Sequence, residues 1–206
     1  MNIEIPEFPE LTFDEKYHIY KLNGDKIPSV SKIMKPLSQA LYSEVNQDVL
    51  DAAAARGTAV HNAIENYILF GITDIPEEYA AYFEAFKDWW KENKPEVLAT
   101  ETRVYHKSFR YAGTADLLAV IGGEKVLIDY KTSSTVNKML TGVQTEAYAK
   151  AYESHGIKFD RKMILHLTKD GKYTEHSYPA KDAESMETFS ALLTVYAHIK
   201  KYGGKG

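Results

Sequence analysis

The spacing of apolar residues predicts two helices in the first half of the chain. Over residues 47–70, apolar side chains recur every three or four positions and the pattern ends at Gly71, which is typical of a helix with a glycine C-cap; Gly57 is a candidate break within it. A second helix is predicted after Pro76, with an aromatic stripe at helical spacing that ends at Trp90. Because the other face of this helix is charged, we interpret the stripe as buried core and not as a platform for stacking bases.

The N-terminal segment has the pattern of a short hairpin. Two strands are predicted at 16–22 and 26–27, joined by an Asn-Gly pair that tolerates the positive φ of a tight turn. A short helix is predicted at 30–34, with Ser29 as its N-cap and Pro36 as its stop.

After Pro95 the pattern changes to the period of strands. The predicted elements are strands 96–106, 111–121 and 125–130, helix 136–155, strands 161–168 and 172–178, and helix 181–201. The first three strands read as an antiparallel meander. This order predicts an α/β or α+β fold with a central mixed β-sheet flanked by helices. We expect a single domain over 1–206, with an N-terminal hairpin and helical part at 11–93 and a core at 94–201.

Composition excludes several classes of function. The chain has 25 Lys and Arg against 29 Asp and Glu, a net charge of -4, so any polyanion must be held locally. Cysteine is absent, which excludes disulfides, thiolate nucleophiles and an iron-sulfur cluster. No apolar run reaches the roughly 20 residues of a membrane helix, and the start of the chain lacks the pattern of a signal peptide. We therefore expect a cytoplasmic protein without a membrane partner; no P-loop occurs, so no nucleotide cofactor is expected.

Two carboxylates interrupt runs that otherwise read as buried strand, namely Asp116 and Asp129. A buried carboxylate is costly unless it meets a cation, a hydrogen-bond network or a metal. In the second run, Asp129 and Lys131 share one face of the strand while Tyr130 points to the other. If the two strands are neighbours, these three charged groups converge and can bind Mg²⁺ or Mn²⁺ for phosphodiester hydrolysis. A structural salt bridge between Lys131 and one aspartate is the alternative.

At these residues the sequence resembles the PD-(D/E)XK nuclease superfamily, and within it the RecB-like, phage-type exonuclease branch. Asp116 matches the acidic residue of one hairpin strand, although alanine precedes it where the motif has proline, and Asp129 with Lys131 matches the (D/E)-x-K of the next. Residues 56–61, with a glycine and a histidine, match an upstream helix of that branch. The resemblance implies a restriction-endonuclease-like core.

The resemblance also implies roles for individual residues. It assigns metal binding to His61, Asp116, Asp129 and the Tyr130 carbonyl, and places Lys131 next to the attacking water. Some relatives bind an iron-sulfur cluster through cysteines, which this chain lacks.

Downstream, Gln144 and Tyr148 match a Gln-x-x-x-Tyr motif, so that the resemblance covers roughly 55–150. It implies that the amide and hydroxyl reach the DNA backbone or Asp129. The two side chains also stand one helical turn apart beside alanines, so that capping a core stripe is the alternative.

Six further residues are candidates for DNA binding or for support of the metal ligands: Glu65, Glu101, Thr132, Arg56, Ser29 and Ser31. Glu65 lies one helical turn after His61 and is either an acceptor for its imidazole or a surface residue. Glu101 either supports the site or is a solvated strand residue. The helix start at Ser29 and Ser31 can offer amides and hydroxyls to a phosphate, or be purely structural.

The predicted function is a divalent-metal-dependent DNA exonuclease, using Mg²⁺ or Mn²⁺, in DNA recombination, repair or replication. Its partner would be DNA, as single strands or duplex ends, with a recombination or single-strand-binding protein as a further candidate. A catalytically silent DNA-binding module on the same fold and a structure-specific endonuclease are the alternatives.

Overall fold

The computed structural model describes residues 5–203. The elements over this range, in chain order, are β1 (Leu11–Asp14), β2 (Ile19–Leu22), β3 (Asp25–Ile27), α1 (Val30–Tyr42), α2 (Gln47–Phe70), the 3-10 turn η1 (Glu77–Tyr79), α3 (Ala80–Asn93), β4 (Glu96–Tyr105), β5 (Ala112–Ile121), β6 (Glu124–Lys131), α4 (Lys138–Glu153), β7 (Arg161–Leu167), β8 (Tyr173–Pro179) and α5 (Ala183–Tyr202).

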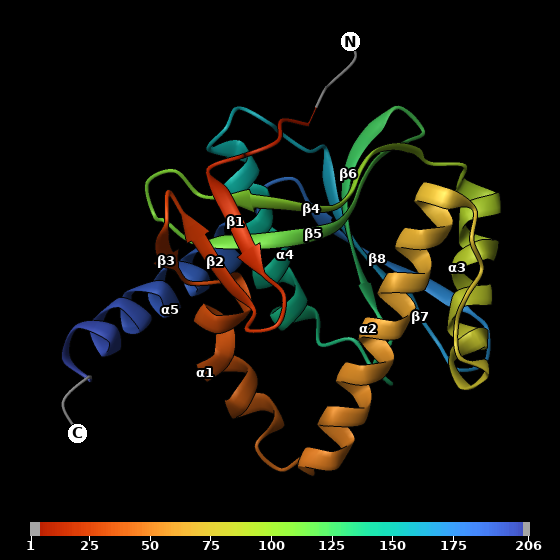
Figure 1. The fold of residues 1–206 in the computed structure, drawn as a ribbon, viewed down its shortest axis with the longest axis horizontal. Coiled ribbons are helices and arrows are strands. Elements are labelled where there is room, and N and C mark those ends of the chain that lie inside the picture. Colours follow the sequence, from red (N-terminus) through yellow and green to blue (C-terminus); the bar gives the residue numbers. More distant parts are fainter. Residues whose placement is uncertain (1–4, 204–206) are drawn as a thin grey trace.

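The central sheet has the strand order β4-β5-β6-β7-β8. Strands β4, β5 and β6 form the predicted antiparallel meander, β6 and β7 run parallel, and β8 returns antiparallel to β7. Helices α2 and α3 pack on one face, while α1, α4 and α5 pack on the other (Figure 1). The predicted mixed sheet flanked by helices is therefore confirmed.

The two long helices before the sheet also follow the sequence pattern. Helix α2 runs without a break through Gly57, so the predicted interruption there is wrong, and it ends at Gly71 in the left-handed conformation that a C-cap requires. The aromatic stripe of α3 is buried, with Phe83, Phe86 and Trp89 each at most 2% exposed. Its interpretation as core is thus confirmed.

The N-terminal segment differs in two respects from the prediction. Strands β2 and β3 form the expected hairpin, but β1 pairs with β2 as a further antiparallel strand that the sequence pattern did not indicate. Helix α1 continues through Pro36 to Tyr42, so the predicted stop is wrong. Proline removes only one backbone hydrogen bond, and the apolar face carrying Val30 and Ile33 is buried against the core, which favours continuation.

Hydrogen bonds to β5 help to attach the small sheet to the central one. The Ala112 N–H donates to the Pro28 carbonyl at 2.9 Å, and the hydroxyls of Tyr20 and Thr114 are hydrogen-bonded at 2.7 Å. The small sheet therefore lies beside the first half of β5. Within residues 5–203, none of the helices combines the length and apolar character that a membrane span needs.

Candidate active site

The site forms where β5 and β6 separate. The two strands are paired from Ile121 and Glu124 down to Leu117 and Ile128. The next residue on each strand, Asp116 and Asp129, lies just beyond the last pair, and both side chains are buried. The strand ends thus place two carboxylates next to each other at the mouth of a fork.

Side chains alternate along β6 as the sequence predicts. Lys131 Nζ lies 2.5 Å from Asp129 Oδ2 and forms an ion pair with it. The Tyr130 side chain turns to the opposite face and packs on Phe86, with ring centroids 5.8 Å apart. Asp129 Oδ2 is a buried oxygen, and the Lys131 ammonium is its cationic partner. Such an oxygen is well suited to a cation.

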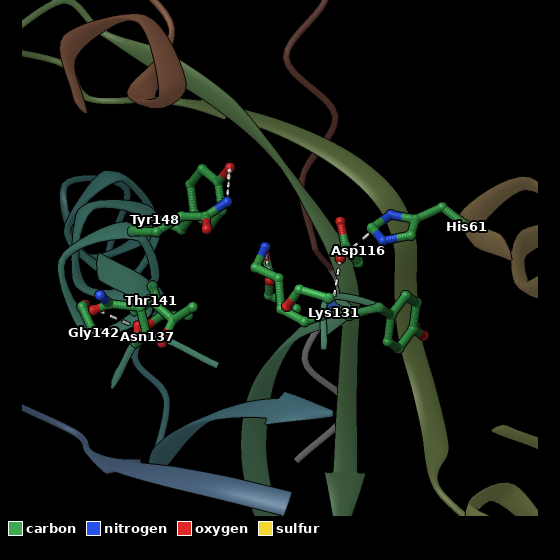
Figure 2. A network of polar contacts seen from close by, with 12 residues as sticks. His61, Asp116, Lys131, Asn137, Thr141, Gly142 and Tyr148 are labelled. Carbon is green, nitrogen blue, oxygen red and sulfur yellow. Dashed lines mark hydrogen bonds and ion pairs between the residues drawn. The ribbon is translucent and has the colours of Figure 1, made fainter. Parts of the chain in front are cut away.

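A second group of donors lies on the other side of Asp116. His61 Nδ1 lies 3.6 Å from Asp116 Oδ2 and 3.9 Å from Glu101 Oε1. One ligand atom from each of these residues can be chosen so that all lie within 4.8 Å of one another. Figure 2 shows His61 reaching from α2 toward Asp116, with Lys131 beside them. This is the spacing of a group that can hold a metal ion.

Glu101 joins this group from the position on β4 that lies opposite Asp116. Pairing with β5 is regular at Thr100 and at Thr102, but Glu101 between them has φ +45°, in the left-handed region that residues other than glycine rarely adopt. The carboxylate therefore points at the residue opposite, Asp116. The sequence left the place of Glu101 open, and the structure puts it in the cluster with His61.

Backbone contacts hold Asp116 in position. The Tyr130 N–H donates to Asp116 Oδ2 at 2.7 Å, and Thr100 Oγ1 donates to the Asp116 carbonyl at 3.0 Å. Both contacts come from the neighbouring strands, so the orientation of this carboxylate is set by the sheet.

Burial opposes negative charge on the carboxylates of the cluster. Burial raises the pKa of Glu101 to about 8, and the charges of Asp116 and Glu65 add to this effect. Burial also raises the pKa of Asp116 to about 6, against the opposing effect of His61. Burial lowers the pKa of Lys131, but the negative charges of Asp129 and Asp116 raise it by more. The net effect is a raised pKa. Lys131 is thus an ammonium ion.

On α4, Gln144 and Tyr148 act as a pair. Gln144 Nε2 donates to the Tyr148 hydroxyl at 3.1 Å (Figure 2). Burial raises the pKa of Tyr148, and the charge of Asp129 adds to this effect, so the hydroxyl stays protonated. Asn137 is the N-cap of α4, and its side chain accepts from the Leu140 N–H at 3.1 Å.

These groups open into a cleft of about 810 Å³. The predicted residues that line it are His61, Glu65, Glu101, Asp116, Tyr148, Ser29 and Ser31. Asp129, Tyr130, Lys131 and Gln144 are not part of its lining; Lys131 contacts Asp129, and Gln144 contacts Tyr148.

The remaining predicted residues make contacts with one another or with a helix end. Arg56 Nε donates to Thr132 Oγ1 at 3.3 Å. Thr132 follows Lys131 in the sequence, and neither Arg56 nor Thr132 lines the cleft. Ser29 is the N-cap of α1: its hydroxyl accepts from the Lys32 N–H at 3.1 Å and lies 3.0 Å from the Ser31 hydroxyl.

The cleft also has lining residues outside the predicted set of site residues. Phe13, His18, Tyr20 and Arg103 line it, from the small sheet and from β4. The alternation around Tyr20 indicated a strand, but a shared wall with Phe13 depends on the pairing of β1 with β2.

Comparison with known families gives one match: the family model of the PD-(D/E)XK nuclease superfamily covers residues 36–201. Among curated proteins, none matches the chain.

Three solved structures show low similarity to the chain. The protein SSO0001 is 15% identical, with a TM-score of 0.46 over 84% of this chain and 76% of its own. The alkaline exonuclease LHK-Exo from Laribacter hongkongensis is 17% identical, with a TM-score of 0.40 over 74% of this chain and 91% of its own. LHK-Exo in complex with dAMP is 13% identical, with a TM-score of 0.39 over 84% and 86% of the two chains.

Proposed function

This chain belongs to the PD-(D/E)XK nuclease superfamily, and we propose that it is a divalent-metal-dependent DNA exonuclease that hydrolyses phosphodiester bonds. The observation that carries the proposal is the meeting of His61, Glu101 and Asp116 at one end of the fork, beside Asp129 and its ion pair with Lys131. We place its role in DNA recombination, repair or replication.

The donor set fits a divalent cation. Two carboxylates and an imidazole offer ligand atoms within 4.8 Å of one another. Hard oxygen ligands suit Mg²⁺ and Mn²⁺, and the imidazole favours Mn²⁺. The buried Asp129 carboxylate, beside Lys131, and the Tyr130 carbonyl would complete the set. When bound, the metal would polarise the phosphodiester and acidify a water molecule.

The residues around the cation would divide the remaining tasks. Lys131, ion-paired with Asp129, would orient or deprotonate the attacking water and offset negative charge on the phosphate. Tyr148, supported by Gln144, would hold the DNA strand at the cleft. Arg56 and Thr132 would contact the DNA backbone next to Lys131.

The proposal is tested by loss of the fork residues. Asp129→Asn and Lys131→Ala should each abolish cleavage of linear DNA in Mn²⁺ and in Mg²⁺ while the protein still melts cooperatively. Lys125→Ala, at the other end of the same strand, is the matched control and should cleave like wild type. Activity retained in both fork variants would overturn the proposal.

Exonuclease and endonuclease action are separated by the form of the DNA. The resemblance of the 56–61 helix and of the Gln144–Tyr148 pair to the RecB-like branch supports an exonuclease. We therefore expect linear DNA to be degraded and circular single-stranded and double-stranded DNA to survive. Cutting of the circles would replace the exonuclease by an endonuclease, and binding without cutting would favour a silent module.

A further inference from the structure

One part of the cleft lining differs in chemistry from the acidic cluster. It is formed by Phe13 on β1, His18 in the β1–β2 turn and Tyr20 on β2, which we call the aromatic wall. The ring centroids of Phe13 and Tyr20 are 4.4 Å apart, and those of Phe13 and His18 are 5.0 Å apart. On β4, the Arg103 guanidinium lies 5.2 Å from the Phe13 ring centroid. The cleft therefore has an acidic part and an aromatic part with one guanidinium, which lies 3.6 Å from the Glu15 carboxylate.

Core packing does not account for the whole of this wall. Tyr20 is 2% exposed and forms the base of the wall, but Phe13 is only half-buried and His18 is exposed. His18 also has φ +49°, in the left-handed region, at the turn between the strands. Aromatic surface is thus presented to the cleft at a position where the protein itself covers it incompletely.

The aromatic wall is held at a fixed place relative to the acidic cluster. The Tyr20 hydroxyl is hydrogen-bonded to Thr114 Oγ1 at 2.7 Å, two residues before Asp116 on β5. Arg103 is paired in register with Thr114 and lies two residues after Glu101 on β4. A nucleotide whose phosphate lies at Asp116 therefore has its sugar and base in the same cleft as the aromatic wall.

We propose that the aromatic wall binds the unpaired base of a nucleotide next to the scissile phosphate, and that the substrate is single-stranded DNA. The inference rests on the proposed function, because it takes the position of the scissile phosphate from the proposed metal site. Base faces stack on aromatic rings whatever their sequence, and arginine adds a cation beside the ring. A base within a duplex has its faces covered by its neighbours, so only an unpaired base can take this position. The wall accordingly selects the strand form and not the sequence.

Binding without cleavage tests the wall separately from the chemistry. Anisotropy of a labelled single-stranded oligonucleotide is measured in EDTA at low salt, against an abasic strand of the same length and charge. Wild type should bind the intact strand more tightly than the abasic one. Phe13→Leu, which keeps an apolar side chain but removes the ring, and His18→Ala should weaken binding of the intact strand about five- to a hundredfold and leave the abasic strand unchanged.

Tyr17→Ala is the matched control, because Tyr17 is an aromatic residue of the same turn, 64% exposed and outside the cleft lining. It should bind both strands like wild type. The inference is overturned if wild type binds the intact and the abasic strand equally, or binds neither detectably. It is also overturned if Phe13→Leu and His18→Ala weaken binding of both strands by the same factor. A duplex bound as tightly as the single strand overturns the strand selectivity.

The two proposals fail in different ways. Wild type that distinguishes the intact strand from the abasic one but does not cleave in Mn²⁺ contradicts the exonuclease and leaves the wall in place. Wild type that cleaves in Mn²⁺ but does not distinguish the strands contradicts the wall alone.

Discussion

Tyr148 on α4 lies against the backbone of Gly113 on β5, so closely that a β-carbon at position 113 would be 2.3 Å from Tyr148 Cε1. Replacement of Gly113 by alanine must therefore push the ring away. Overpacking of this kind costs about 1–3 kcal/mol of stability. Because Tyr148 lines the cleft, we also expect kcat/KM on DNA to fall about 10- to 100-fold. Urea unfolding and a cleavage assay measure the two effects.

Removal of the Tyr148 ring separates the clash with this ring from other effects of Gly113→Ala. Tyr148→Ala combined with Gly113→Ala should lose less stability than the sum of the two single variants, because the added methyl group then meets no ring. Additive losses in the double variant would show that the contact between the two residues does not determine the cost.

The elements that the sequence predicts well are those with a local signal. The period of helix 47–70 and its glycine cap lie within one segment, and so do the strands of the 96–130 meander. Asp116 and Asp129 stand out in the sequence because each interrupts an apolar run, and Lys131 because it shares a strand face with Asp129. Their proximity follows from the pairing of two consecutive strands, which are usually neighbours.

What the sequence does not indicate depends on distant parts of the chain. Strand β1 (Leu11–Asp14) is four residues long and exists through its pairing with β2. The left-handed conformation of Glu101 has no local signal, since glutamate rarely adopts it, and the pairing with β5 keeps its register on both sides of it. Phe13 and His18 meet only after the small sheet has formed.

The stability of the metal-free protein should decrease as the pH rises. Burial raises the pKa of Glu101 from 4.5 to about 8, so the folded state binds a proton that the unfolded state has already released. The free energy of unfolding therefore falls between those two pKa values. His106, His155 and His176, whose pKa burial lowers from 6.5, act in the opposite direction at acidic pH. The comparison is therefore made between about pH 6.5 and 8.5.

Thermal melts in EDTA check this expectation. Each kcal/mol lost should lower the Tm by about 2–4 °C. Glu101→Gln, which has no charge to bury, should flatten the decrease, whereas Glu96→Gln, at an exposed position of the same strand, should not. A wild-type Tm that is constant or rises over this range would contradict the buried charge of Glu101.

Gly57→Ala should increase stability and weaken substrate binding. Gly57 lies inside α2 with an ordinary helical backbone, and a β-carbon there would meet nothing within 4 Å. Alanine in a helix interior stabilises by about 0.5–1 kcal/mol relative to glycine. The open space around the added methyl group belongs to the cleft, so we expect KM for DNA to rise with kcat unchanged. Tm and steady-state kinetics measure the two effects.

The exposed Ala54 on the same helix provides the matched control. Ala54→Gly should lower the Tm by a similar amount and leave KM unchanged. If Gly57→Ala raises the Tm without any change in KM, DNA does not approach this part of α2.

The last prediction separates a metal ligand from a simple ion-pair partner at His61. A ligand that binds only the folded state stabilises it by about 2.7 kcal/mol at a concentration of 100 times its Kd. Mn²⁺ should therefore raise the Tm of wild type, and His61→Ala should remove most of that increase. His198→Ala, at an exposed position on α5, should keep it.

If His61 served only as a partner of Asp116 and Glu101, at 3.6 Å and 3.9 Å, its loss would lower the Tm in EDTA and leave the increase in Mn²⁺ unchanged. The same melts thus decide between the two roles without any measurement of activity. Because the imidazole favours Mn²⁺ over Mg²⁺, we also expect the Tm increase that depends on His61 to be larger in Mn²⁺.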